Sequence, residues 1–343
     1  MGTAALRQSI VDYCANIGAD PMLVQGAGGN VSWKENDLLW VKASGTCLSD
    51  AAIKDIFVSV KLFYLQKEIS RGNFSVQPEL DSESKLRPSI ETLLHALMPQ
   101  AVVMHLHAIE ILAHLVRKNY LDKFDTLLDA YNNINWLNVG YYKPGPELAK
   151  AVSESLGNNQ DINVIFLQNH GVVIGGETVE EVDDILRILI SAMSTAMIEK
   201  SAINPPKLPS RINNNDTKYF PIEDAALHQL ATDRIMYNRL GSDWALYPDH
   251  VVFLGAFAHK YEDAGSFREE LSGCKKSPEL VFIKDTGVFV TRGFTEAKRA
   301  QLRCYYDVII RQPQKGSVNP LANEQIAELL NWDAEQYRMN MTY

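Results

Sequence analysis

The alternation of helical and extended patterns along residues 4–200 constrains the fold of this chain more than any other feature of its sequence. Apolar residues recur at helical spacing in some segments, and short apolar runs bounded by turn residues, typical of strands, lie between them. The expected helices cover 4–18, 89–97, 146–157 and 178–200, and the expected strands cover 38–43, 102–107 and 163–168. Strands that alternate with helices favour an α/β domain built in layers around a central sheet.

Local signals mark several ends of these expected elements. Ser89 follows Pro88 and is a plausible N-cap for the helix at 89–97. Pro146 lies at an expected first helical position, and Gly157 is a stop signal for the same helix. Thr178 and Glu181 have the spacing of a capping box at the start of the helix at 178–200.

The segment NPPKLPSRINNNDTK, residues 204–218, interrupts the alternation with three prolines and an asparagine run. Its composition predicts a linker or long loop, which divides a domain at 1–203 from a C-terminal part at 219–343. In that part HVVFLGAF (250–257) resembles a strand, and ELVFIKDTGVFVT predicts a hairpin. TEAKRAQLRCYYDVIIRQ and NEQIAELLNWDAEQYR predict helices. We therefore expect a mixed α+β C-terminal extension.

Composition narrows the classes of partner and compartment. The formal net charge of −9 disfavours nucleic-acid and anionic-membrane partners, because these need basic surfaces. The four cysteines are scattered and form no CxxC pair, so neither a thiolate zinc site nor a disulfide framework is indicated. We find no signal-peptide pattern and no apolar run near the roughly 20 residues of a membrane span. These features predict a cytoplasmic protein without a membrane partner.

Three histidines are candidate metal ligands. In QAVVMHLHAIE, side chains alternate along the expected strand, so His105 and His107 point to one face while Met104 and Leu106 point to the other. His170 follows another apolar strand, in an Asn-His-Gly turn. Three imidazoles suit zinc with a fourth position open. The alternatives are histidines satisfied within the core and an ordinary turn.

Other residues add polar chemistry at comparable positions. Glu91 lies near the start of the helix at 89–97, where the helix dipole alone would favour an acid, but a carboxylate there could also move protons. His95 lies on the same helical face, and we expect it to pack or to support a ligand. QGAGGNVSW and VKASGTCLS expose backbone N–H groups of the kind that bind phosphate, although neither matches a P-loop or a dinucleotide fingerprint.

Taken together and in order, five motifs resemble the class II aldolase/adducin family. They are GAGGNVS, VKASGT, PSIETLLHA, VVMHLHA and LQNHGVVIGGETVEE, and they extend over roughly residues 5–200. The family includes fuculose-phosphate and rhamnulose-phosphate aldolases, a ribulose-phosphate 4-epimerase, a dehydratase and the adducin head domain. The resemblance implies a three-layer α/β/α domain with a central, mostly antiparallel sheet.

The resemblance also implies roles for particular residues. His105, His107 and His170 would hold a divalent metal, with zinc expected, and Glu91 would be the catalytic carboxylate. Asn30, Ser44, Gly45 and Ser89 match positions that hold the substrate phosphate in the sugar-phosphate enzymes. Lys42 lies beside them and would add positive charge. Ile90 replaces a second phosphate-binding serine of some aldolases.

A tyrosine serves as proton donor in the family aldolases, often from a neighbouring subunit. Tyr131 and Tyr142 are our candidates in the corresponding region, where Tyr141 also lies. The alternative for all three is packing. Asp249 and His250 lie outside the family domain. They could approach a site, but we favour a role in capping a loop.

The resemblance implies a lyase that cleaves or condenses a small ketose or ketose phosphate through a metal-stabilised enediolate. The partner would be a small sugar or sugar phosphate, and the assembly a homo-oligomer, with tetramers known among relatives. The same metal chemistry serves 4-epimerases, dehydratases and decarboxylases. A non-enzymatic, adducin-like interaction module is the alternative from a different class.

Overall fold

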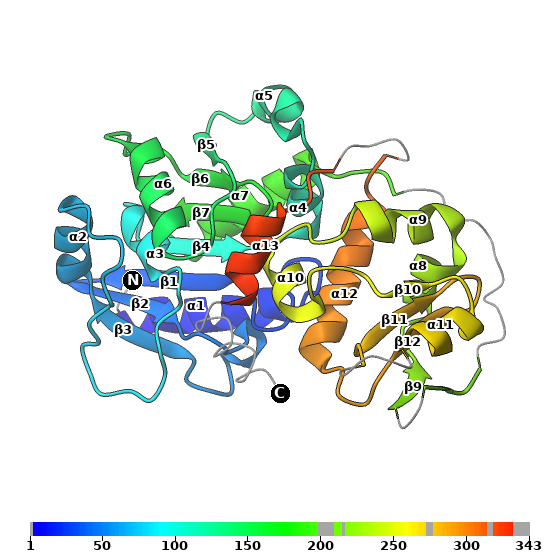
Figure 1. Cartoon of the computed structure of the whole chain (residues 1–343). Helices are drawn as coiled ribbons and strands as arrows, with labels where there is room; N and C mark the ends of the chain where they lie inside the picture. Colours follow the sequence, from blue (N-terminus) through cyan, green and yellow to red (C-terminus); the bar gives the residue numbers. More distant parts are fainter. Residues whose placement is uncertain (1–2, 198–208, 215–216, 272–276, 314–317, 332–343) are drawn as a thin grey trace.

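The computed structural model describes residues 3–197, 209–214, 217–271, 277–313 and 318–331, and it contains two β-sheets that lie side by side (Figure 1). The larger sheet has seven strands in the order β3-β2-β1-β4-β7-β6-β5. All neighbours pair antiparallel except β5 and β6, which are parallel. The strands are β1 (Asn30–Glu35), β2 (Leu38–Lys42), β3 (Phe57–Lys61), β4 (Val102–Leu106), β5 (Trp136–Val139), β6 (Val164–Leu167) and β7 (Gly171–Gly176).

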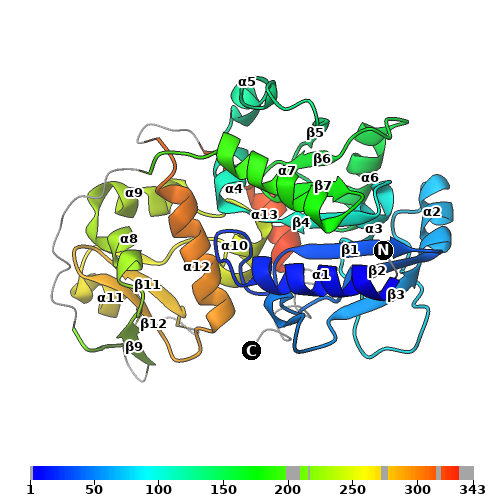
Figure 2. The ribbon, with the colours of Figure 1, turned by 180° about the vertical axis from the view of Figure 1, so that it is seen from behind.

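Helices cover both faces of this sheet, which confirms the α/β/α architecture expected from the sequence (Figures 1 and 2). One face packs on α1 (Thr3–Gly18) and α7 (Val179–Ala192), and the other on α2 (Leu62–Ser70), α3 (Thr92–Leu97) and α6 (Pro146–Leu156). The period of two in β4 produces this division, because Met104 joins the first core while Val103 joins the second. Shorter elements are η1 (Leu48–Asp50), α4 (Ile109–Leu115), η2 (Tyr120–Lys123) and α5 (Phe124–Leu128).

The C-terminal part is a mixed α+β unit, as expected. Its five-stranded sheet has the order β10-β11-β12-β9-β8, and the predicted hairpin is β11–β12, which turns at residues 284–286. The strands are β8 (Ile212–Asn214), β9 (Thr217–Pro221), β10 (Lys260–Tyr261), β11 (Leu280–Ile283) and β12 (Gly287–Val290). The helices are η3 (Ala225–His228), α8 (Gln229–Thr232), α9 (Arg234–Ser242), α10 (Pro248–Leu254), α11 (Ala264–Leu271), α12 (Glu296–Ile309) and α13 (Asn323–Leu330).

Four local predictions are corrected. Residues 250–257, expected as a strand, belong mainly to helix α10, which has Pro248 in its first turn and ends at Gly255 with φ 90°. The helix expected at 89–97 begins at Thr92, so Ser89 is not its N-cap. Helix α7 ends at Ala192, and residues 198–200 of the expected helix lie outside the described residues. Within the segment expected as linker, 212–214 and 217–218 are paired strands, and 204–208 and 215–216 lie outside the described residues.

Helix α4 joins the two parts. Its residues Ile111 and Leu115 are buried in the core under the larger sheet, while Ile109 and Leu112 are buried in the core of the C-terminal part. The ion pair between Arg311 Nε and Glu110 Oε1, at 2.8 Å, crosses the same boundary. This short helix therefore helps to hold the C-terminal part beside the end of β4. Among the helices that the structure describes, none is both long and apolar enough to span a bilayer.

Candidate metal centre

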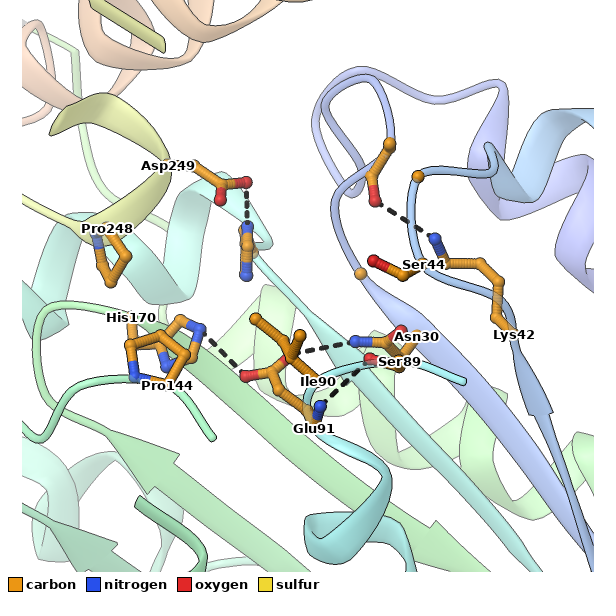
Figure 3. Close-up of a pocket in the computed structure, with 14 residues that line it drawn as sticks. Asn30, Lys42, Ser44, Ser89, Ile90, Glu91, Pro144, His170, Pro248 and Asp249 are labelled. Carbon is orange, nitrogen blue, oxygen red and sulfur yellow. Dashed lines mark hydrogen bonds and ion pairs between the residues drawn. The ribbon is translucent and has the colours of Figure 1, made fainter. Parts of the chain in front are cut away.

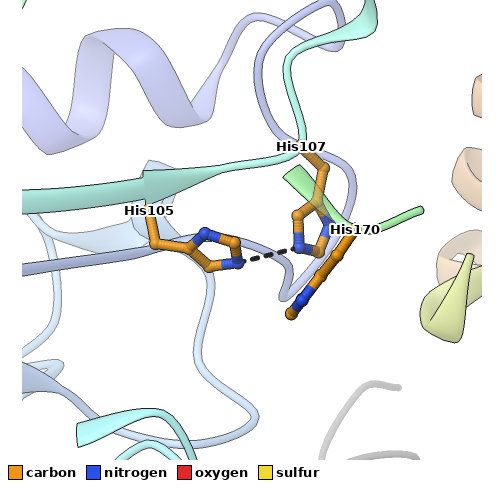
Figure 4. A group of neighbouring side chains, drawn as sticks. All are labelled: His105, His107 and His170. Carbon is orange, nitrogen blue, oxygen red and sulfur yellow. Dashed lines mark hydrogen bonds between the residues drawn. The ribbon is translucent and has the colours of Figure 1, made fainter. Parts of the chain in front are cut away.

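The three predicted histidines come from two neighbouring strands of the larger sheet. His105 is in β4, His107 follows it, and His170 lies in the turn between β6 and β7. Strands β4 and β7 pair antiparallel with His105 opposite Val173, so the end of β4 lies beside this turn. The nearest ligand nitrogens of the three imidazoles all lie within 4.8 Å of one another, and all three residues are buried (Figure 4).

The hydrogen-bond partners of two histidines direct their lone pairs toward one another. His105 Nδ1 lies 3.1 Å from the carbonyl oxygen of Val172, which can only accept, so this nitrogen carries the proton. His107 Nδ1 lies 3.4 Å from Asp249 Oδ2, which also favours a protonated Nδ1. The two Nε2 atoms are then unprotonated, and they lie 3.2 Å apart with their lone pairs directed toward each other. Two nitrogens bound to one tetrahedral zinc ion would be about 3.4 Å apart, so these residues fit a divalent metal.

Burial reinforces this state for His105. Desolvation lowers the pKa of its imidazole and the nearby His107 lowers it further, while the carboxylate of Glu91 opposes the shift. A lowered pKa keeps the ring neutral, and the neutral imidazole is the form that binds a metal.

The residues on either side of His170 shape the turn that carries it. Asn169 adopts a left-handed conformation with φ 54° and donates from Nδ2 to the carbonyl oxygens of Leu246 and Asn319, both at 2.7 Å. At Gly171, a Cβ atom would lie 2.4 Å from the carbonyl oxygen of Leu106 and within about 3.2 Å of two histidine rings. Position 171 therefore has no room for a side chain, and any other residue there would push the two histidine rings out of place.

Glu91 immediately precedes helix α3, and its carboxylate points into the histidine cluster. Its Oε2 lies 3.5 Å from His105 Nε2 and accepts from Asn30 Nδ2 at 2.8 Å, and its Oε1 lies 3.3 Å from His170 Nε2. The Oγ of Ser89 accepts a hydrogen bond from the Glu91 backbone N–H at 3.2 Å (Figure 3). The side chain is only 7% exposed, so this carboxylate is fixed and largely dry.

One pocket contains most of the predicted site residues (Figure 3). Its lining includes Asn30, Lys42, Ser44, Gly45, Ser89, Ile90, Glu91, His107 and His170. Lys42 is buried and donates from Nζ to the carbonyl oxygens of Ala27 at 3.1 Å and Thr46 at 2.6 Å. It therefore connects the two glycine-containing loops and brings a positive charge to the same wall.

The tyrosines lie elsewhere in the chain. Tyr131 is half-buried against the core beneath α1 and α7, and Tyr142 is 45% exposed. Neither is among the described residues that line the pocket. Tyr141 packs against the core of the C-terminal part.

His95 lies behind the pocket rather than in it. It is fully buried on α3, and its Nδ1 is 2.8 Å from the Oγ of Ser32 in β1. Burial lowers the pKa of His95 to about 3, and the neighbouring His105 contributes to the shift. This neutral ring fills the space between the sheet and the helix that carries Glu91.

Sequence reasoning considered that Asp249 could approach a site but favoured another role for it, and so it largely missed the contribution of the C-terminal part. Asp249, expected to cap a loop, lines the pocket together with Pro248 and contacts His107. Asn169, treated as turn chemistry, also binds backbone carbonyls of the C-terminal part. Sequence spacing carries no signal for either contact, because the partners are far apart along the chain.

Comparison with known proteins places the N-terminal part of this chain in a family. The family model described as the Class II Aldolase and Adducin N-terminal domain matches residues 8–196. The "Uncharacterized oxidoreductase YuxG" of Bacillus subtilis (strain 168) is 32% identical over 180 residues, 48% of this chain. The matched region is only 25% of the length of YuxG.

Two solved structures are also similar to this chain. The N-terminal class II aldolase domain of a conserved protein from Thermoplasma acidophilum is 28% identical with a TM-score of 0.44, covering 54% of this chain and 90% of that one. YgbL from Klebsiella pneumoniae is 22% identical with a TM-score of 0.45, covering 56% and 88%. Because the family model matches more than half of the residues, this chain belongs to the class II aldolase and adducin N-terminal domain family.

Proposed function

We propose that this chain is a metal-dependent aldehyde-lyase that cleaves or condenses a small ketose or ketose phosphate. The observation that carries the proposal is the convergence of three imidazoles and the Glu91 carboxylate at one pocket that also has a serine and glycine wall. A divalent ion bound by His105, His107 and His170, with zinc expected, would act as a Lewis acid that stabilises negative charge on substrate oxygens.

Glu91 is the proposed proton-transfer residue. Asn30 holds its Oε2, while Oε1 accepts no hydrogen bond from the described residues and lies at the histidine cluster. An oxygen in that position can take a proton from a bound substrate and return it. Burial keeps bulk water from competing for this carboxylate.

The opposite wall of the pocket suits an anionic or hydroxyl-rich group. Ser44, Gly45 and Ser89 place hydroxyl and amide donors beside the charge of Lys42. The Ser89 oxygen accepts from Glu91, so its own proton is available for a substrate oxygen. Ile90 lines the same pocket and contributes an apolar contact instead of a further donor.

The proton donor to the leaving fragment would be a tyrosine from a neighbouring subunit of a homo-oligomer. Tyr142 is the more accessible candidate because it is 45% exposed, whereas Tyr131 packs partly against the core. A tetramer is the assembly that the family resemblance favours.

The test starts with the metal content of the purified, tag-free protein after dialysis against a weak chelator. We expect about one zinc or other divalent ion per chain in the wild type and none in His170→Ala, since the site then has too few ligands. His259→Ala is the matched control, because it removes a histidine outside the site. A wild-type chain that takes up no metal, even on reconstitution, would contradict the proposal and favour an adducin-like interaction module.

Product analysis on a panel of ketoses and ketose phosphates then identifies the reaction. Cleavage gives two carbonyl fragments, epimerisation gives none, dehydration releases water and decarboxylation releases carbon dioxide. We expect cleavage, with Glu91→Gln lowering turnover by roughly 10²–10⁴-fold. Full cleavage activity and full metal content in His170→Ala would exclude the assigned site. The oxidoreductase name of YuxG is not carried over, because the match covers only a quarter of that protein.

A further inference from the structure

The structure assigns a positioning role at the metal centre to the C-terminal part: Asp249 orients the ligand His107, and Gln301 orients Asp249. This inference rests on the proposed metal site. The residues come from three separate segments, namely the end of β4, helix α10 and helix α12. Asp249 lines the pocket, and Figure 3 shows its carboxylate directed at an imidazole nitrogen.

The contacts form a chain that leads out from the centre. His107 Nε2 faces His105, and its Nδ1 lies 3.4 Å from Asp249 Oδ2. Gln301 Nε2 donates to the same oxygen at 3.2 Å. A carboxylate beside Nδ1 stabilises the tautomer with its proton on that atom, and so it leaves the Nε2 lone pair for a metal.

Burial makes this arrangement rigid. The side chains of His107 and Asp249 are 7% and 2% exposed, and Gln301 is also buried. The backbone of Gly28 covers the contact, because a Cβ atom there would lie 3.3 Å from Asp249 Oδ2 and 3.4 Å from His107 Nδ1. Solvent therefore has little access to the contact, and the carboxylate remains in place.

The groups that orient His105 and His107 consequently come from different parts of the chain. His105 donates to the carbonyl oxygen of Val172, within the family domain. His107 depends on a carboxylate from the C-terminal part, which the family match at residues 8–196 does not include. The C-terminal part thus completes the metal centre instead of acting only as an appended module.

The experiment measures the affinity of the full chain for Zn²⁺, by competition with a chromogenic chelator, and the visible spectrum of the Co²⁺-substituted protein. We expect Asp249→Asn to weaken Zn²⁺ binding 10–100-fold, the usual effect of losing such a partner, and to change the Co²⁺ spectrum. Gln301→Leu should change both in the same direction by less. Asp307→Asn is the matched control, since Asp307 is a buried carboxylate of the C-terminal part that pairs with Arg303 instead.

The outcomes separate this inference from the proposed function. Wild-type chain that binds neither metal overturns both. Wild-type chain that binds metal, with affinity and spectrum unchanged in Asp249→Asn, overturns the positioning role alone. If Asp249→Asn does not fold, Gln301→Leu decides: wild-type affinity and spectrum in that variant would overturn the role. Equal weakening in Asp307→Asn would show a general effect of stability and would also overturn it.

Discussion

Asn169, His170 and Gly171 show at the scale of single residues how a candidate metal ligand is placed. Asn169 tolerates the positive φ that reverses the chain, and Gly171 leaves room for the rings of His105 and His107. The position of His170 after a strand allowed the sequence to predict that it groups with His105 and His107. The two hydrogen bonds from Asn169 to the C-terminal part could not be predicted, because their acceptors are backbone carbonyls distant in sequence.

His250 provides a pH-dependence prediction at the same scale. It is fully buried between Trp244 and Tyr305, and desolvation lowers its pKa from 6.5 to about 3. The unfolded chain binds a proton at this residue below pH 6.5 and the folded chain does not, so stability is lost as pH falls from 6.5 toward 3. This group should account for about 2–3 kcal/mol of the stability lost between pH 7 and pH 4.5.

We expect His250→Gln to reduce the pH dependence by that amount, measured by urea unfolding at the two pH values. The comparison is internal to each protein, so any packing cost of the substitution cancels. Part of the pH dependence of the free energy of unfolding should remain in the variant, because burial also lowers the pKa values of His95 and His114, to about 3 and about 4. An equal loss of unfolding free energy between the two pH values in the wild type and in His250→Gln would contradict the prediction.

At the scale of elements, end signals and context decided what periodicity left ambiguous. The run HVVFLGAF is apolar and partly β-branched, so periodicity alone does not separate a strand from a buried helix. Pro248 in the first turn and Gly255 at the end, with φ 90°, fit the helix. The start of helix α7 was predictable because its N-cap residue and its buried face agree, whereas its end at Ala192 came earlier than expected.

The cap of α7 gives a prediction about stability without function. Thr178 Oγ1 accepts from the backbone N–H of Glu181 at 3.2 Å. Thr178→Ala should lower the free energy of unfolding by about 1 kcal/mol, because that N–H loses its partner. Thr178→Ser should retain the wild-type value, and metal content should be unchanged in both. A loss of metal in Thr178→Ala would show that α7 affects the site, which the structure does not predict.

At the scale of the whole molecule, helix α4 couples the two parts through a shared core and an ion pair. Glu110 and Arg311 have side chains only 14% and 8% exposed, and Glu110 Oε2 also accepts from the backbone N–H of Thr195. Removing the carboxylate leaves a buried guanidinium without its counter-charge, which is costly.

Glu110→Ala should therefore destabilise the chain by about 3 kcal/mol. Far-UV circular dichroism and tryptophan fluorescence should report the same shift in the urea midpoint, because the helix belongs to both cores. Glu296→Ala is the control: Glu296 is 89% exposed, so its pair with the half-buried Arg299 should contribute less than about 1 kcal/mol. Equal effects of the two variants would show that the pair at the boundary is not important.

The sequence by itself determined the layered α/β/α domain. It also predicted that the three histidines, Glu91 and most of the serine and glycine residues of the pocket wall lie together. These depend on local periodicity and on residues at the ends of strands, which a single sequence displays directly. Only the tertiary structure placed Asp249 against His107 and Asn169 against the C-terminal part, and only it separated Tyr131 and Tyr142 from the pocket of their own chain. Such contacts depend on how distant segments pack, and neither spacing nor propensity encodes that packing in a form that can be read locally.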